Sequence, residues 1–239
     1  MSIIGNPERI GRFTSSEIWK LMQMDRSGND FGQKALTYID EKKIETRMGR
    51  SITIESYSQA MAWGIFMEMY VFSMIGVEYI ITSNTTDMHP SINCWSGSKD
   101  LIVEGHKVSD IKCYQPKKFA QYTDVIISRD LEKMKKDFKE EYWQLVSNAI
   151  INQVPNAEAI TFMPYESELE EIRDMAENYD GPDQWKYRFI AEKDKDGLPY
   201  LPDGGYYKNL NKFEFEVPKD DIELLTDRVK QAQQILTSK

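Results

Sequence analysis

The segment DLIVEGHKVSDIKC, residues 100–113, restricts the fold of this chain more than any other stretch. Two runs rich in Ile and Val flank a glycine at position 105, which predicts an antiparallel hairpin with a tight turn. With the turn centred near Gly105, Asp100 stands opposite Asp110, and directly opposed residues have Cα atoms about 4.5 to 5.5 Å apart. Because strand side chains alternate, Lys112 lies on the same face as Asp110, about 6.5 Å further along. The hairpin therefore predicts two carboxylates and one ammonium group in one place.

Two carboxylates this close repel each other unless they share a proton or a metal cation. Mg²⁺ suits such hard oxygen ligands and keeps water and phosphate oxygens in its shell. A lysine beside it would orient or deprotonate an attacking water, or stabilise charge on phosphorus. This combination indicates phosphodiester hydrolysis. With 29% charged residues the spacing also arises easily by chance, and the alternative is a solvated hairpin with a cross-strand ion pair.

Two further polar residues stand in apolar surroundings. Glu68 lies within AMAWGIFMEMYVF, a stretch with helical spacing of apolar residues, where a buried carboxylate needs a partner or a metal. The alternative is an acid on the helix surface. Gln144 lies between Trp143 and Leu145, and the alternative for it is simple exposure to solvent.

Composition excludes several classes of protein. The net charge of −9 argues against a protein that coats DNA through an overall positive field, although a local basic channel remains compatible with it. The longest apolar run, around residues 62–75, is interrupted by Glu68 and is too short for a bilayer span, and no signal sequence is recognisable. Cys94 and Cys113 are too few for a zinc or iron–sulfur site and are expected to be buried thiols. We therefore expect a cytoplasmic protein with no membrane association.

Apolar periodicity alternates between helical and strand spacing along the chain, which predicts an α/β fold with a mixed central β-sheet flanked by helices. We expect a single domain over residues 1–239, with the acidic, turn-rich region 166–211 as a surface elaboration. The expected helices cover residues 14–22, 33–48, 60–74, 130–153 and 220–236. The expected strands lie within residues 77–83, 92–97, 100–113, 157–165 and 212–217.

Four motifs, taken in order, resemble the YqaJ-type viral recombinase family. They are RIGRFTSS, the helix around Glu68, the hairpin WSGSKDLIVEGHKVSDIKCYQP, and EEYWQLVSNAIINQVPNAEAITFMPY. That family includes phage lambda exonuclease and belongs to the PD-(D/E)xK nuclease superfamily. The resemblance covers about residues 9–165, leaving 166–239 as an elaboration, and it implies a restriction-endonuclease-like core.

The resemblance also implies a role for each site residue, with Mg²⁺ as cofactor and Mn²⁺ as a substitute. Asp100 and Asp110 would bind the metal, with the backbone carbonyl of Ile111 as a further ligand. Glu68 would hold a second metal or its water. Lys112 would position the nucleophilic water, and Gln144 would assist near the scissile phosphate. The chain departs from the family pattern at Lys99, where proline is usual, and at Asp110, where glutamate is commoner.

Arg9 and Ser16 match the family's pocket for the 5′-phosphate of a DNA end. A guanidinium and a hydroxyl at a helix N-terminus suit a terminal phosphate, and the alternative is a solvated arginine. Family members often form ring-shaped trimers around DNA, so Lys117 and Lys118 are candidates to line a channel in a homotrimer. The alternative for them is a solvated pair.

The leading prediction is a Mg²⁺-dependent 5′-to-3′ exonuclease acting on double-stranded DNA ends. It would leave 3′ overhangs for a single-strand annealing protein during phage or prophage recombination in a bacterial host. Three alternatives stay open: an endonuclease or RecB-like nuclease, a non-catalytic DNA-end-binding scaffold, and a phage structural or interaction protein.

Overall fold

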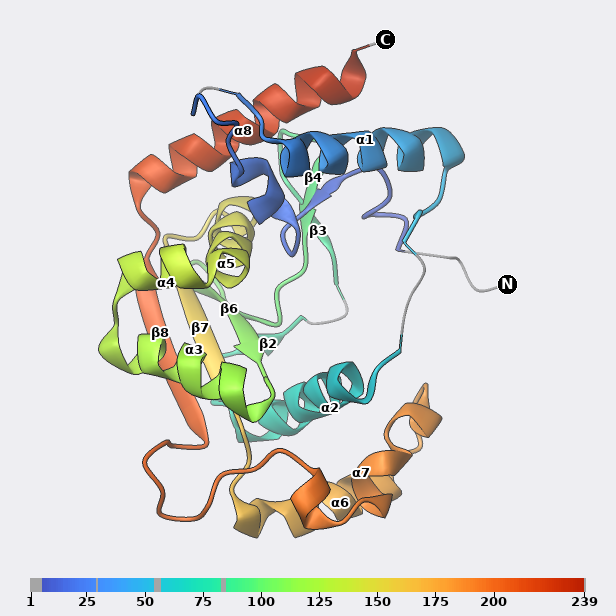
Figure 1. The fold of residues 1–239 in the computed structure, drawn as a ribbon, viewed down its shortest axis with the longest axis vertical. Helices are drawn as coiled ribbons and strands as arrows, with labels where there is room; N and C mark the ends of the chain where they lie inside the picture. The colour runs from blue at the N-terminus through green and yellow to red at the C-terminus, as the bar shows by residue number, and fades with distance from the viewer. Residues whose placement is uncertain (1–5, 29, 54–56, 83–84, 239) are drawn as a thin grey trace.

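The computed structural model describes residues 6–28, 30–53, 57–82 and 85–238. In these ranges a five-stranded sheet has the order β2-β5-β6-β7-β8, and β6 and β7 run parallel while all other neighbours are antiparallel (Figure 1). Its strands are β2 Ile80–Ile81, β5 Leu101–Val103, β6 Lys107–Lys112, β7 Asn156–Phe162 and β8 Leu210–Glu216. A small second sheet has the order β1-β4-β3, formed by Phe13–Thr14, Trp95–Gly97 and Asp87–Met88.

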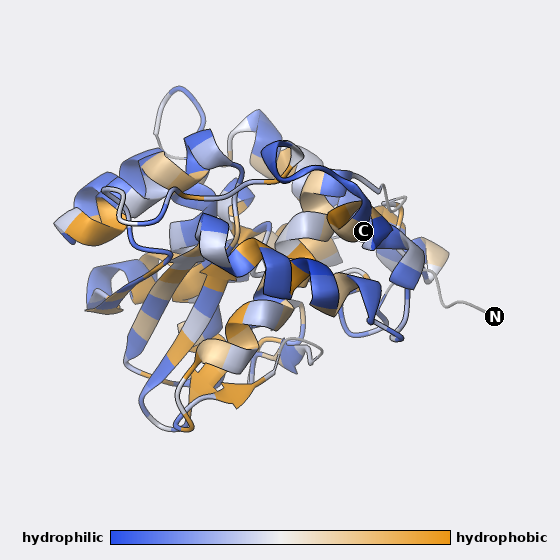
Figure 2. Cartoon of the chain, turned by 90° about the horizontal axis from the view of Figure 1, so that it is seen from below, coloured by the Kyte–Doolittle hydropathy of each residue, from blue (hydrophilic) through white to orange (hydrophobic). Residues whose placement is uncertain are grey.

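Helices cover the five-stranded sheet, so the predicted α/β class with a mixed central sheet is confirmed. They are α1 Gln33–Met48, α2 Gln59–Met74, α3 Pro116–Ser128, α4 Leu131–Asp137, α5 Lys139–Asn152, α6 Leu169–Glu177, α7 Arg188–Glu192 and α8 Lys219–Thr237. Along these helices hydrophilic and hydrophobic residues alternate (Figure 2), as expected for elements that bury one side. Among the helices of the described ranges, none has the length and apolarity that a bilayer span requires.

The two faces of the sheet are buried in two separate hydrophobic cores. Side chains alternate along β7, so Ala157 and Ala159 join the core that contains residues of α1, α5 and α8, while Ile160 and Phe162 join the core with α2 and α6. Strand β7 is buried on both faces, with only its first residue, Asn156, partly exposed. The carboxyl end of β6 therefore lies between α5 on one face and α2 on the other.

Two predicted helices differ from the observed ones. Residues 14–22 form only a short 3-10 turn, η1, at Ile18–Met22, because Thr14 is engaged in strand β1. The helix expected over 130–153 is divided into α4 and α5 at Phe138, whose backbone (φ −126°, ψ 54°) is not helical. Helix α3 and strand β3 were not anticipated from the sequence.

The region 166–211 is more than the surface elaboration that its acidic composition predicts. Leu169 and Ile172 of α6 and Ile190 of α7 are buried in the core that packs against α2. Figure 1 shows α6 and α7 beyond α2, on the side away from β6. This region thus fixes the position of α2, the helix that carries Glu68.

Candidate active site

The hairpin forms as predicted. Gly105 adopts a left-handed conformation (φ 67°) in the turn, which a residue without Cβ allows at no steric cost. Leu101 pairs with Ser109 across the strands, and the same register places Asp100 opposite Asp110. The Asp100 Oδ2 atom accepts a hydrogen bond of 2.6 Å from the backbone N–H of Ile111. Because N–H and C=O of one strand residue face the same neighbour, the carbonyl of Ile111 is directed to this edge as well.

Asp110, Lys112 and Gln144 form a closed triangle of polar contacts. The Lys112 ammonium lies 2.7 Å from Asp110 Oδ2, and the Gln144 amide donates to Asp110 Oδ1 at 2.6 Å. Lys112 also donates to Gln144 Oε1 at 3.3 Å. The two strand residues therefore share a face, as predicted, and α5 supplies the third group. Gln144 is engaged in the site, which rules out the alternative of a merely solvent-exposed side chain.

Helix α2 crosses the end of β6 closely enough to bring Glu68 to these groups. A Cβ added at Gly64 would lie 3.6 Å from the carbonyl oxygen of Cys113, so the helix passes directly over the strand. One turn later, burial raises the pKa of Glu68 well above its ordinary value, and the charges of Asp100 and Asp110 add to the shift while Lys112 opposes it. Glu68 is therefore a neighbour of the hairpin residues and not an acid on the helix surface.

Burial and mutual repulsion dominate the electrostatics of the site. Burial raises the pKa of Asp100 to about 7, and the negative charge of Asp110 contributes further. The pKa of Asp110, 2% exposed, is also raised by burial, although the Lys112 ammonium opposes this. Burial favours the neutral form of Lys112, but Asp110, Asp100 and Glu68 outweigh it and raise its pKa. The neighbouring carboxylates therefore favour the charged form of Lys112, which suits orienting water and stabilising charge.

The residues present fit a divalent cation by the chemistry of their donors. Three carboxylates, those of Glu68, Asp100 and Asp110, face one ammonium, so their full ionisation would place an excess of two negative charges in a buried site, which a divalent cation would balance. Asp110 Oδ2 is buried without a hydrogen-bond partner in the described residues, apart from its ion pair with Lys112. Across the same ranges no three His, Cys, Asp or Glu side chains already stand as a metal cage. The ligand roles of these carboxylates and of the Ile111 carbonyl therefore stay predictions.

Arg9 and Ser16 contact each other, and the residue next to Ser16, Ser15, contacts α5, the helix that carries Gln144. The Arg9 guanidinium donates to Ser16 Oγ at 3.0 Å, and both side chains are exposed. The neighbouring Ser15 Oγ lies 2.7 Å from Ser147 Oγ, and Ser147 follows Gln144 by three residues. The argument from a helix N-terminus does not hold, because the following element is only a five-residue 3-10 turn. The structure brings the Arg9 guanidinium and the Ser16 hydroxyl together, and phosphate binding by this pair stays a prediction.

Glu141, which the sequence did not single out, and Lys99, noted there only as a departure from the family's proline, are neighbours of the site. Glu141 is buried, accepts a hydrogen bond from Tyr114, and raises the pKa of Asp110 through its charge. Lys99, which replaces the family's proline, is 4% exposed and forms an ion pair with Asp87 of β3. A buried charge with a distant partner leaves no periodic signal in a sequence, so the ion pairs of these two residues were not predictable.

The two lysines proposed to line a channel have different surroundings. Lys118 forms an ion pair with Glu141 at 2.8 Å and lies 4.0 Å from the ring centroid of Tyr114. Lys117 is exposed, beside it on α3. Lys118 is thus ion-paired, although its side chain is 46% exposed, and the channel role of both lysines stays a prediction.

No protein-family model matches the sequence, and no curated protein does. Solved exonucleases share the fold. The alkaline exonuclease LHK-Exo in complex with dAMP matches at a TM-score of 0.59 and 15% identity, over 96% of this chain and 90% of that one. The structure of LHK-Exo from Laribacter hongkongensis gives 0.57 and 15%, over 95% and 89%.

A phage-related exonuclease from Haemophilus somnus 129PT gives a TM-score of 0.58 and 13% identity, over 94% of this chain and 93% of that one. At such identities the likeness concerns the fold. Because it covers nearly the whole chain, it extends beyond residues 9–165 into the C-terminal elaboration.

Proposed function

We propose that this chain is a metal-dependent DNA exonuclease that degrades the 5′-ended strand of a double-stranded end and leaves a 3′ overhang. The observation that carries the proposal is the buried group of Asp100, Asp110, Lys112 and Gln144, with Glu68 beside it, within a fold shared with solved exonucleases. A buried excess of carboxylates around one lysine is costly for stability alone, which supports a catalytic role over a solvated hairpin.

Asp100, Asp110, Glu68 and the carbonyl of Ile111 would hold Mg²⁺, for which Mn²⁺ would substitute. When bound, the metal supplies Lewis-acid stabilisation of phosphate charge and a more acidic water. Lys112, charged at neutral pH, orients the attacking water and balances charge that develops on the phosphate oxygens.

The other residues of the site position DNA or the catalytic groups. Gln144 is a positioning residue, because its amide holds both Asp110 and Lys112. Arg9 and Ser16 would bind the 5′-phosphate of the DNA end through charge-assisted hydrogen bonds. The same proposal includes a homotrimer and a single-strand annealing protein that takes up the overhang in phage-type recombination.

The test uses a linear duplex with one 5′-phosphorylated end, one blocked 5′ end, and a different label on each strand. We expect loss of the phosphorylated strand alone in Mg²⁺, release of mononucleotides, and no reaction in EDTA or with Lys112→Ala. Lys219→Ala, an exposed lysine on α8, serves as matched control and should digest normally. Cleavage of a closed circular duplex would favour an endonuclease, and end binding without hydrolysis in Mg²⁺ or Mn²⁺ would favour a scaffold.

A further inference from the structure

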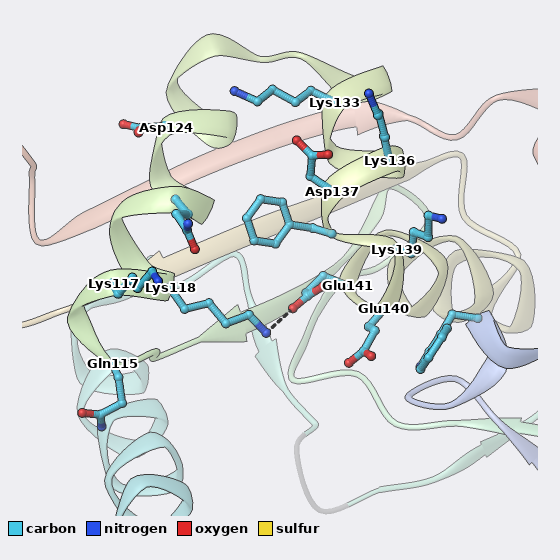
Figure 3. Close-up of a pocket in the computed structure, with 13 residues that line it drawn as sticks. Gln115, Lys117, Lys118, Asp124, Lys133, Lys136, Asp137, Lys139, Glu140 and Glu141 are labelled. Atoms are coloured by element: carbon cyan, nitrogen blue, oxygen red, sulfur yellow. Dashed lines mark ion pairs between the residues drawn. The ribbon is translucent and has the colours of Figure 1, made fainter.

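A basic cavity of about 870 Å³ lies between α3, α4 and the start of α5. Five lysines and four acids line it, although the whole chain has a net charge of −9. Figure 3 shows Lys118 reaching from α3 to Glu141, with Lys117 beside it on α3 and with Lys133 and Lys136 on α4 at the other side. The cavity therefore collects ammonium groups from separate helices.

Most of these lysines lack a counter-ion. Lys118 is neutralised by Glu141, whereas within the described residues Lys117, Lys133, Lys136 and Lys139 form no ion pair, and Figure 3 marks only the contact of Lys118. Of the four acids only Glu141 is in an ion pair in the described part of the chain, with Lys118, while Asp124 accepts a hydrogen bond from the neutral Tyr207 hydroxyl and keeps its charge. Five lysines against four acids leave the lining with a net charge of +1. Unpaired ammonium groups around one hollow attract a polyanion.

Aromatic side chains complete the lining. Phe138, partly buried at the break between α4 and α5, and Trp19 of η1 both border the cavity. Lysines that follow a phosphate backbone, together with aromatic faces for bases, are the combination by which proteins bind single-stranded nucleic acid. A duplex keeps its base faces stacked on one another and cannot use these rings. The volume also lies within the roughly 300 to 1,000 Å³ of small-ligand sites, which suits a few nucleotides of one strand.

The cavity adjoins the candidate active site. Glu141 lines it, raises the pKa of Asp110 and precedes Gln144 by three residues. Gln115, at its other side, follows Lys112 by three residues. We propose that this cavity binds a short stretch of single-stranded DNA next to the scissile position, with phosphates on Lys133, Lys136 and Lys139 and a base against Phe138. The proposal rests on the proposed nuclease function.

The experiment measures binding apart from hydrolysis. A fluorescently labelled oligothymidine is titrated with protein in EDTA at several NaCl concentrations, and anisotropy gives the affinity. For Lys133→Glu/Lys136→Glu we expect binding weakened about tenfold or more, and a slope of log K against log salt that is smaller by roughly 1.4, about 0.7 for each lost phosphate contact. The control Lys219→Glu/Lys230→Glu changes the net charge equally on α8, outside the cavity, and should bind within twofold of wild type.

Hydrolysis of bis(p-nitrophenyl) phosphate in Mn²⁺ reports on the active site separately. Loss of oligothymidine binding in the cavity variant alone, with the small diester still cleaved, supports both proposals. The same loss without diester cleavage by any form, wild type included, overturns the nuclease function and leaves the binding site standing. Wild-type affinity of the cavity variant overturns the binding site, whatever the cleavage result. If thermal unfolding shows that this variant is misfolded, Lys136→Glu/Lys139→Glu replaces it with the same criteria.

Discussion

The stability of the metal-free protein should fall as pH rises through neutrality, because of Asp100. Burial and the neighbouring Asp110 raise the pKa of Asp100 to about 7 in the folded protein, whereas an aspartate in an unfolded chain titrates near about 3.9. The folded state then binds the proton more tightly than the unfolded state. Its contribution to stability is fully present below the unfolded pKa and is lost as pH rises through the folded pKa.

The size of this effect follows from the two pKa values. Between pH 5 and pH 8 a single site of this kind loses about 2 to 3 kcal/mol of unfolding free energy. For a chain of this length that corresponds to a Tm lower by about 5 to 10 °C. Asp100→Asn keeps an oxygen that accepts the N–H of Ile111 but cannot ionise, so the variant should lack this component of the pH dependence.

The assay is thermal unfolding in EDTA at pH 5, 6, 7 and 8 for wild type and Asp100→Asn. We expect wild type to lose Tm relative to the variant as pH rises. Mg²⁺ added at pH 8 should raise the Tm of wild type more than that of Asp100→Asn, because it binds the ionised carboxylates of the native state. Parallel Tm curves for the two proteins from pH 5 to 8 would refute the conclusion that Asp100 is buried among like charges.

Three further substitutions test other parts of the site. Lys112→Ala removes the counter-ion of Asp110 and should lower the unfolding free energy in EDTA by about 3 kcal/mol, measured by urea unfolding; an unchanged midpoint would contradict the ion pair. Gly97→Ala places a Cβ 2.1 Å from Ser15 Oγ and should cost about 1 to 3 kcal/mol, whereas a wild-type Tm would mean that Ser15 moves aside freely. Arg9→Ala should reduce the preference for 5′-phosphorylated over 5′-hydroxyl ends about tenfold or more, measured as the ratio of initial rates; an unchanged ratio would place the phosphate elsewhere.

The hairpin was predictable because its geometry is determined within fourteen residues. A glycine turn and the two-residue strand period together fix which side chains oppose each other, so the positions of Asp100, Asp110 and Lys112 followed from the sequence. Helix α1 was predicted over its full length for a similar local reason.

Contacts between distant segments could not be predicted in this way. Gln144 reaches Asp110 over 34 residues, and Ser15 reaches Ser147 over 132. Only the packing of α5 across the sheet decides these contacts, and no local spacing encodes it. The division of α4 from α5 at Phe138 has the same character, because the apolar pattern continues across a break that tertiary packing imposes.

The lysine at position 99 illustrates how a departure from a family pattern acquires a physical role. A proline there would fix the backbone just before Asp100 through its ring. Lys99 is almost fully buried, and its ammonium pairs with Asp87 of β3, while Thr82 donates a hydrogen bond to its carbonyl oxygen. A buried charge is retained only when its partner is in place, so the ion pair ties the segment between β4 and β5, just before Asp100, to strand β3. Rigidity that a ring would supply within the chain is here supplied by a contact across twelve residues.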